Sequence, residues 1–298
     1  MGILNVTDDS FYDGGRYRTP EAIVTRALQL MQDGADIIDI GASSSRPGAI
    51  LLPPDEEARR LQEAVTLVRQ ALPEAVLSVD TCYSLPARKA IEAGADIVND
   101  IGGGQLDTEM YHTISDLQVP YILMHGASAT NPHAEIHQRD LETLIDEITQ
   151  FFSRQIDTLY TLGIKDLWID PGFGFGKTME ENLQLLDHLD QLTTLFREPL
   201  LAGISRKRMI YRTLDITPEE ALNGTIALDT IALDRGARIL RVHDPKPAIE
   251  TVKLLYTIES LCYIPLSVFP TSASSISSTS PSLPCWFITS TAWPAAPM

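Results

Sequence analysis

The sequence has few cysteines, no long apolar run and no start that resembles a leader peptide. Its three cysteines, Cys82, Cys262 and Cys285, show neither metal-binding nor disulfide spacing, which favours a reducing compartment. No run approaches the ~18 consecutive apolar residues of a membrane-spanning helix. The opening residues MGILNV carry no basic segment and no cleavage site of a secretory signal. We therefore expect a cytoplasmic protein with no membrane partner.

Basic residues are also scarce. The 298 residues include 23 Lys and Arg against 40 Asp and Glu, which gives a formal net charge of −17. This charge argues against nucleic acid as a partner, because phosphate contacts require a basic surface. A small anionic ligand remains compatible, since salt screens distant charges and a few local arginines can dominate a site. A hydrophobic content of 44% is typical of a globular protein with a substantial core.

A nucleotide-binding loop is absent too, although the stretch DPGFGFGKT (170–178) ends like one. The P-loop pattern requires a glycine five positions before Gly176, and that position is Pro171, which has no N–H to offer a phosphate. The dinucleotide fingerprint requires two residues between its second and third glycines, and only one separates the last two glycines here. We interpret the stretch as a flexible loop that follows Asp170.

Four glycines each follow a helical pattern and precede a short, β-branched apolar run. They stand in DGADIIDIG (33–41), AGADIVNDIG (93–102), LGIKDLWIDPG (162–172) and RGARILRVHD (235–244). A glycine that ends a helix just before a strand marks the helix-to-strand joint of a parallel sheet. With the gaps filled, the pattern predicts strands near 2–6, 35–41, 76–80, 96–100, 121–125, 167–170, 200–205 and 239–243.

Eight strands separated by helical patterns predict a (β/α)8 TIM barrel of the α/β class. A doubly wound open sheet is the alternative, but it usually has fewer units and carries the nucleotide fingerprint that is missing here. Two of the helices have clear predicted starts, at Thr19-Pro20 and Thr217-Pro218, where a capping hydroxyl precedes a proline.

The chain is predicted to hold one domain, residues 1–264, followed by a tail of residues 265–298. The tail contains no charged residue, and 19 of its 34 residues are Ser, Thr or Pro. This composition predicts a disordered, low-complexity segment.

Polar residues gather at the carboxyl ends of the predicted strands. They are Asn5, Asp39, Asp80, Asn99 and Asp100, His125 after Met124, Asp170, Ser205 to Lys207, and Arg241 with His243. One or two polar strand ends could simply leave the core, but a polar group at nearly every end is harder to explain that way. Because the active sites of barrels form at this face, we predict a site there.

The residue types at this face indicate what the site binds. Arg46, Lys207, Arg241 and His243 suit a phosphate or diphosphate, and the arginines add a planar fork of donors. Asp80, Asn99 and Asp170 can bind the edge of an aminopyrimidine-like ring, because a carboxylate accepts two parallel N–H bonds and an amide both donates and accepts. We predict a ligand with a hydrogen-bonding heterocycle at one end and phosphate at the other.

At this level of detail the chain resembles a known family. The motifs are GILNVTDDSFYDGG (2–15), DIGASSSRPGA (39–49), SVDT (78–81), ADIVNDI (95–101), DPGFGFGK (170–177), GISRK (203–207) and RVHD (241–244). In order and spacing, from residue 2 to about 261, they resemble those of dihydropteroate synthases. These transferases join 6-hydroxymethyl-7,8-dihydropterin diphosphate to 4-aminobenzoate in folate biosynthesis, release diphosphate, and are sulfonamide targets. The resemblance also implies a homodimer and a Mg²⁺ cofactor.

The resemblance assigns a role to each matching residue. Asn5 would bind the Mg²⁺ that accompanies diphosphate, and Arg241 and His243 would hold the diphosphate together with Ser45 and Arg46. The residues that would contact the pterin ring are Asp80, Asn99, Asp170 and Lys207, and those that would shape the aminobenzoate pocket are Phe11, Ser45 and Pro47. The implied catalytic residues are Lys207, Arg241, His243 and Asp80.

The resemblance also implies that the glycines after Asp170 let the chain turn sharply beside the pterin ring. Lys177 is then interpreted as a surface or loop lysine rather than a phosphate ligand.

Two other functions compete with this interpretation. One is transfer of a methyl group from methyltetrahydrofolate by a related pterin-binding barrel, which would not need a diphosphate clamp such as Arg46 and the SRK and RVHD motifs. The other is a non-catalytic pterin-binding paralogue, against which every ring-binding and clamp residue is present.

Overall fold

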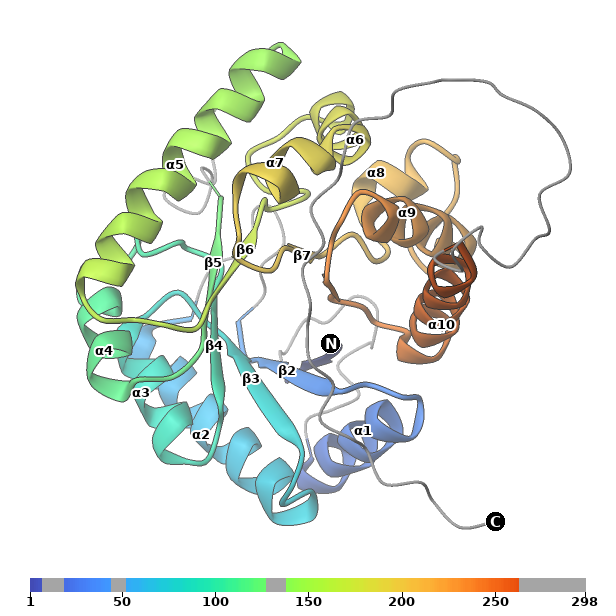
Figure 1. Cartoon of the computed structure of the whole chain (residues 1–298). Coiled ribbons are helices and arrows are strands. Elements are labelled where there is room, and N and C mark those ends of the chain that lie inside the picture. The colour runs from blue at the N-terminus through green and yellow to red at the C-terminus, as the bar shows by residue number, and fades with distance from the viewer. Residues whose placement is uncertain (7–18, 44–51, 127–137, 263–298) are drawn as a thin grey trace, which may run out of the picture.

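Eight parallel strands surrounded by helices form the core of the molecule (Figure 1). The computed structural model describes residues 1–6, 19–43, 52–126 and 138–262. The strands are β1 (Gly2–Asn5), β2 (Ile37–Gly41), β3 (Val76–Asp80), β4 (Ile97–Asp100), β5 (Tyr121–Met124), β6 (Leu167–Asp170), β7 (Leu201–Ala202) and β8 (Ile239–Leu240). Each lies where the sequence predicts a strand, although β7 and β8 are shorter than predicted.

The strands pair in chain order and close into a ring. β1 to β6 form one parallel sheet, and β7 pairs in parallel with β8. Bridges between Gly2 and Val242 and between Ile169 and Leu200 join the two groups of strands. The N–H of Ile3 donates to the carbonyl of Val242 at 3.0 Å, which links β1 to the residues after β8. The predicted (β/α)8 barrel is confirmed, and the open-sheet alternative is wrong.

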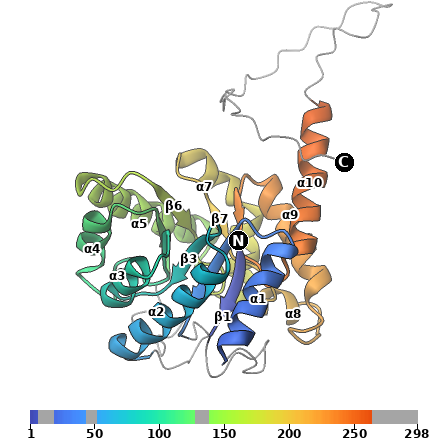
Figure 2. The same cartoon turned by 90° about the horizontal axis from the view of Figure 1, so that it is seen from below.

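The helices lie outside the ring of strands (Figure 1). They are α1 (Pro20–Gln32), α2 (Pro54–Ala71), α3 (Ser84–Glu92), α4 (Met110–Leu117), α5 (Leu141–Thr161), α6 (Met179–Asp187), α7 (Leu189–Leu195), α8 (Arg208–Tyr211), α9 (Leu222–Asp234) and α10 (Pro245–Cys262). The connections before β7 and before β8 each contain two helices. The end of α10 extends past the other helices (Figure 2).

The glycine joints and one of the two predicted helix starts are confirmed. Gly34, Gly94, Gly163 and Gly236 all have positive φ, between 83° and 109°, in the left-handed region that lets a helix end. The Thr19 side chain accepts a hydrogen bond from the N–H of Ala22, and Pro20 is the first residue of α1.

The second predicted helix start, at Thr217-Pro218, is wrong. Residues 218–221 form turns, and α9 begins only at Leu222. The guanidinium of Arg206 donates to the carbonyls of Pro218 and Glu219, at 3.0 and 2.6 Å. Those carbonyls are therefore already hydrogen-bonded to a distant side chain, which competes with the i→i+4 bonds that would begin a helix there.

The interior of the barrel is layered. At its base lie Ile97, Ile122 and Leu201, packed with Met1, Ile37, Trp168 and Ile239. Side chains two residues apart on a strand point to the same side of the sheet. The next inward-facing residues on six of these strands are Asp39, Asn99, Met124, Asp170, Gly203 and Arg241. The alternation therefore places an apolar layer beneath a largely polar one.

Some predictions concern residues outside the described part of the chain. These are the predictions for Phe11, Ser45, Arg46 and Pro47 and for the tail of residues 265–298. Among the residues that the structure describes, no helix has the length and apolar character needed to cross a membrane.

Candidate active site

A polar pocket of about 270 Å³, including its opening to solvent, lies at the carboxyl ends of the strands. Five residues predicted for the site line it, namely Asp80, Asn99, Asp170, Lys207 and Arg241. The other lining residues are Ile101, Met124, Phe175 and Gly203. The structure therefore brings together residues from strands β3 to β6 and from the segments that follow β4, β6, β7 and β8.

Arg241 lies between two carboxylates. Its Nε donates to Asp39 Oδ2 and its Nη2 donates to Asp80 Oδ2, both at 2.6 Å. Asn99 Nδ2 donates to the same Asp39 oxygen at 3.1 Å. Asp39 is fully buried and orients both an arginine and an amide of the pocket. The sequence placed Asp39 at a strand end but gave it no role, because its partners lie 60 and 202 residues away.

Burial dominates the electrostatics of these groups. It raises the pKa of Asp80, while the Arg241 guanidinium opposes this rise. Burial also raises the pKa of Asp170, against which the Lys207 ammonium acts most strongly. The pKa of Lys207 falls to about 8, because the loss of water outweighs the attraction of Asp170. The pocket thus holds both charge signs, with carboxylates and an ammonium that titrate closer to neutrality than in water.

The glycine-rich loop that follows β6 forms one wall of the pocket. The Lys207 ammonium donates to the carbonyl of Phe173 and lies 4.7 Å from the centre of the Phe175 ring. Gly172 has a φ of 71°, and a Cβ there would lie 2.0 Å from the carbonyl oxygen of His125. The sharp turn predicted after Asp170 is therefore present and requires glycine at this position.

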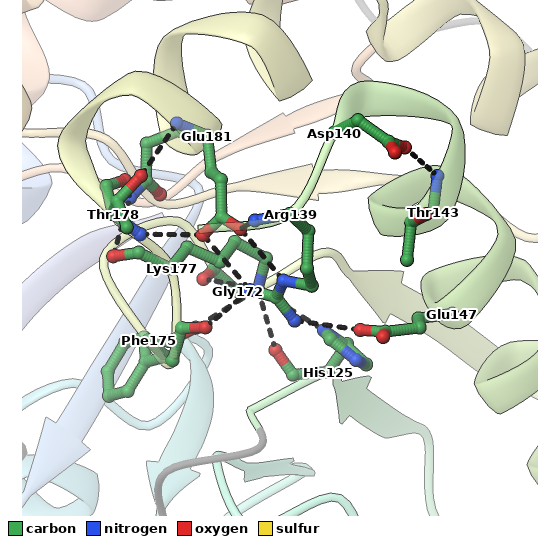
Figure 3. Close-up of polar contacts among 12 residues, drawn as sticks. His125, Arg139, Asp140, Thr143, Glu147, Gly172, Phe175, Lys177, Thr178 and Glu181 are labelled. Atoms are coloured by element: carbon green, nitrogen blue, oxygen red, sulfur yellow. Dashed lines mark hydrogen bonds and ion pairs between the residues drawn. The ribbon is translucent and has the colours of Figure 1, made fainter. Parts of the chain in front are cut away.

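Lys177 lies in the loop between β6 and α6, which is one of the two predicted positions. It is not at the surface, because only 5% of its surface is exposed. Its ammonium donates to the carbonyls of Gly172 and Phe175, both at 3.1 Å, and lies 3.2 Å from Nδ1 of His125 (Figure 3). The loop folds back on itself and encloses the side chain. No local sequence pattern predicts the burial of Lys177, because the groups that enclose its ammonium are mostly backbone carbonyls.

His243 follows Arg241 by two residues, so both side chains point to the same side of the extended chain. His243 also contacts Ser205. The Ser205 hydroxyl is 3.1 Å from His243 Nδ1 and accepts the His243 backbone N–H at 3.2 Å. Burial, helped by the nearby Arg241 charge, lowers the pKa of His243 to about 3. The imidazole is therefore neutral near pH 7. The tautomer in which Nδ1 accepts from the Ser205 hydroxyl carries its proton on Nε2.

Asn5 ends β1 beside Gly41. A Cβ at Gly41 would lie 3.4 Å from Asn5 Oδ1 and 3.7 Å from Asp80 Oδ2. This glycine therefore leaves space between two oxygen donors, of the chemical type that Mg²⁺ prefers. In the described ranges, no group of three or more His, Cys, Asp or Glu side chains is placed to hold a metal. The Asn5 and Asp80 oxygens are compatible with a Mg²⁺ that keeps several water ligands.

The arrangement can bind a flat, hydrogen-bonding ring and an anion together. Acceptors from Asp80 and Asp170 and both functions of Asn99 can pair with ring edges, while Lys207 and Arg241 provide positive charge. Such a pocket suits a reaction in which an anionic group leaves a ring-bearing substrate, because its charges are already in place.

Comparisons with known proteins agree with this chemistry. A family model described as pterin binding enzyme matches residues 1–243. Among curated proteins, the dihydropteroate synthase of Streptococcus pyogenes serotype M6 is 37% identical over 259 residues, which cover 86% of this chain and 93% of the relative. The dihydropteroate synthase of a Synechocystis species is 40% identical over 257 residues, covering 85% and 88%.

Solved structures give the same result. A Yersinia pestis dihydropteroate synthase in complex with a sulfonamide drug superposes with a TM-score of 0.81 at 36% identity, covering 87% of this chain and 94% of that one. The Xanthomonas albilineans dihydropteroate synthase with 4-aminobenzoic acid gives a TM-score of 0.78 at 38% identity, covering 89% and 93%.

Proposed function

This chain belongs to the pterin-binding enzyme family, and from that premise we propose that it is a transferase with dihydropteroate synthase activity. It joins 6-hydroxymethyl-7,8-dihydropterin diphosphate to 4-aminobenzoate, giving 7,8-dihydropteroate and diphosphate in folate biosynthesis. The single observation that carries the proposal is one pocket lined by Asp80, Asn99, Asp170, Lys207 and Arg241. The similar curated proteins and the similar solved structures are dihydropteroate synthases, which disfavours the methyl-transfer alternative.

The pterin ring occupies the polar layer of the barrel. Asp170 Oδ1 accepts the N–H of Gly172 at 2.7 Å, so its second oxygen is directed to the ring. The Asn99 Oδ1 atom is buried and has no hydrogen-bond partner among the described residues. A buried acceptor without a partner costs free energy, and the amino group of a pterin offers a donor that removes this cost.

The reaction breaks a C–O bond and forms a C–N bond at the same carbon. The C–O electron pair leaves with diphosphate, while the amine lone pair of 4-aminobenzoate attacks the pterin methylene and the amine proton is released. The aromatic amine is already a nucleophile, so no strong base is required. The difficult step is departure of the anion, and Arg241 together with His243 stabilises the charge that develops on it.

Arg241 has a wider role than the sequence implied. Because it bridges Asp39 and Asp80, it also holds a ring-binding carboxylate in place. Positive charge grows on the pterin methylene as diphosphate leaves, and Asp80 is the nearby carboxylate that can stabilise it. We therefore assign Arg241 to both the ring and the phosphate parts of the site.

Mg²⁺ is the proposed cofactor, with Asn5 as its ligand from this chain. Bound there together with diphosphate, Mg²⁺ would supply positive charge to the leaving group. The aminobenzoate side is assigned to Phe11, Ser45 and Pro47, and Arg46 and Ser45 add contacts to diphosphate; all four residues lie outside the described ranges. Sulfonamides, which resemble aminobenzoate, are expected to compete for that side.

We also propose a homodimer and a cytoplasmic location. Leu254 and Ile258 lie one helical turn apart on α10 and are 68% and 57% exposed, which supports burial of this face against a second copy. Sedimentation of the protein and of a Leu254→Glu variant tests this, since the variant is expected to be monomeric.

The cytoplasmic location is supported by Cys82, which is buried and unpaired.

The experiment that tests the function is a turnover assay. Purified protein is mixed with the dihydropterin diphosphate, 4-aminobenzoate and Mg²⁺, and both dihydropteroate and diphosphate are measured. Equal molar amounts of the two products are expected. Pterin binding without any product would instead support the non-catalytic paralogue.

A further inference from the structure

The loop that follows β6 is held by cations. Of its carbonyls, those of Gly172 and Phe175 accept from Lys177, that of Phe173 accepts from Lys207, and that of Gly176 accepts from Arg139. Backbone carbonyls in loops are usually satisfied by water or by other backbone N–H groups. The carbonyl of Gly172 also accepts the N–H of Phe175 at 3.0 Å, but the other three are bound by side chains, so basic side chains contribute strongly to the shape of this loop.

Lys177 is the central one of these cations. Its ammonium lies 3.1 Å from two loop carbonyls, 3.2 Å from His125 Nδ1 and 3.4 Å from the His125 carbonyl (Figure 3). His125 follows β5, so the contacts join the loop after β6 to the end of the neighbouring strand. The His125 ring packs edge-on against Phe151, with ring centres 5.1 Å apart, which holds it in place.

His125 acts as an acceptor toward Lys177. Burial lowers the pKa of His125 to about 2, so its imidazole is neutral and Nδ1 can accept from the ammonium. Burial also lowers the pKa of Lys177, to about 7, although the charge of Asp170 opposes the shift. A buried ammonium is costly unless several acceptors surround it, and Lys177 has four.

The loop shape matters because the loop contacts a pocket residue. Lys207 meets the Phe173 carbonyl and the face of the Phe175 ring. A Cβ at Gly174 would lie 3.2 Å from Lys207 Cδ, so the loop backbone passes directly along that side chain. Lys177 itself does not line the pocket. Its effect on a ligand must therefore pass through Phe175 and Lys207.

We propose that Lys177 is a positioning residue for pterin recognition: by fixing the glycine-rich loop against the end of β5, it sets where Lys207 and Phe175 meet the ring. The inference rests on the proposed function, since it assumes that the ring occupies this pocket. It goes beyond that function by assigning a role to a lysine that contacts neither substrate.

The test compares Lys177→Met with Lys165→Met. Lys165 lies just before β6, at the opposite end of the same strand from the loop, and is exposed. The two substitutions therefore remove the same group near the two ends of one strand. Isothermal titration measures the affinity of each folded variant for 6-hydroxymethyl-7,8-dihydropterin, which carries the ring alone, and for inorganic diphosphate with Mg²⁺.

Lys177→Met is expected to weaken binding of the pterin alcohol about tenfold or more, since small misplacements of a contact group have effects of this size. Its diphosphate affinity is expected to stay within about twofold, because the loop contacts the ring side of the site. Lys165→Met should match the wild type for both ligands. Lys177→Gln keeps a donor for the carbonyls and is expected to show the same selective loss, but a smaller one.

Three results would overturn the proposal. They are unchanged pterin affinity in Lys177→Met, equal losses for both ligands, and failure of both Lys177 variants to fold while Lys165→Met folds, which would make Lys177 a stability residue. A wild-type protein that binds no pterin alcohol at all would contradict the proposed function itself, and this outcome is distinct from the other three.

Discussion

The two halves of the barrel interior are built on the same strands and differ sharply in chemistry. The lower half packs Ile97, Ile122 and Leu201 against other apolar side chains. One inward-facing position further along, the upper half holds buried Asp39, Asn99 and Asp170. A step of two residues thus separates a layer that excludes water from one that collects buried charges.

This difference shows how the barrel separates stability from function. Burial of the apolar layer gives a favourable transfer free energy with no unsatisfied groups. The polar layer gains little from burial, because desolvation of its charged groups offsets their mutual attraction. Substitutions in the polar layer are therefore expected to impair ligand binding, whether or not they also leave a buried charge unpaired, whereas substitutions in the lower layer should change stability alone. The following predictions test that separation.

The largest effect is expected for Arg241→Ala in the upper half. The substitution leaves the buried carboxylates of Asp39 and Asp80 without their partner, which should cost about 3–5 kcal/mol of unfolding free energy. It also removes charge from the leaving-group site, so turnover should fall about 100- to 1000-fold.

Titration of Arg241→Ala with pterin alcohol decides whether the arginine serves both parts of the site. We expect affinity for the alcohol to fall as well, because Asp80 loses its support. An unchanged affinity would show that Arg241 acts on diphosphate alone. Arg235→Ala is the control, because this arginine is 38% exposed and pairs with Asp187 away from the pocket.

A smaller and purely structural effect is expected for Ile122→Ala in the lower half. Ile122 is fully buried, so the cavity should lower the unfolding free energy by about 2–5 kcal/mol in a denaturant titration. Pterin-alcohol affinity, measured well below the melting temperature, should be unchanged. A loss of affinity comparable to that of a pocket variant would mean that the two halves are not separable.

A moderate effect is expected from pH. The pKa of Lys207 is lowered to about 8, and only its protonated form gives the pocket a positive charge and three N–H donors. As pH rises through about 8 the ammonium loses its proton, so kcat/KM, which reports ionisations of the free enzyme, should fall. A profile that stays flat to pH 9.5 (roughly one and a half units above the expected midpoint) would rule out this role for Lys207.

The smallest effect is expected for removal of the uncharged tail. A chain that ends at Ile264 should keep its turnover and its melting temperature, because residues 265–298 have the composition of a segment that cannot form a core. A shortened protein that aggregates or loses activity would show that the tail belongs to the folded unit.

The sequence could indicate that Asp80, Asn99 and Asp170 converge on one pocket because the signal is local. Asp80 and Asp170 end their strands and Asn99 is the last residue but one of β4; the apolar pattern of these strands is clear, and the barrel brings their ends together. The strands could be located for the same reason, since a glycine marks the joint before four of them.

What the sequence did not predict depends on contacts between distant residues. The start of α9 is delayed by Arg206, which lies 12 residues before Pro218. The burial of Lys177 depends on a loop that folds back against His125, 52 residues earlier. Asp39 orients Arg241 through a hydrogen bond between residues that are 202 positions apart in the sequence. Such contacts leave no periodic pattern to detect.

The central claim is that the upper layer recognises the pterin ring, and Asp170 tests it most directly. Isothermal titration of pterin alcohol into the wild type and Asp170→Asn isolates the ring from the phosphate. The amide would present an N–H where the ring needs an acceptor, so affinity should fall on the order of a hundredfold while the melting temperature changes little. Equal affinities in the two proteins would contradict the claim and place the ring elsewhere.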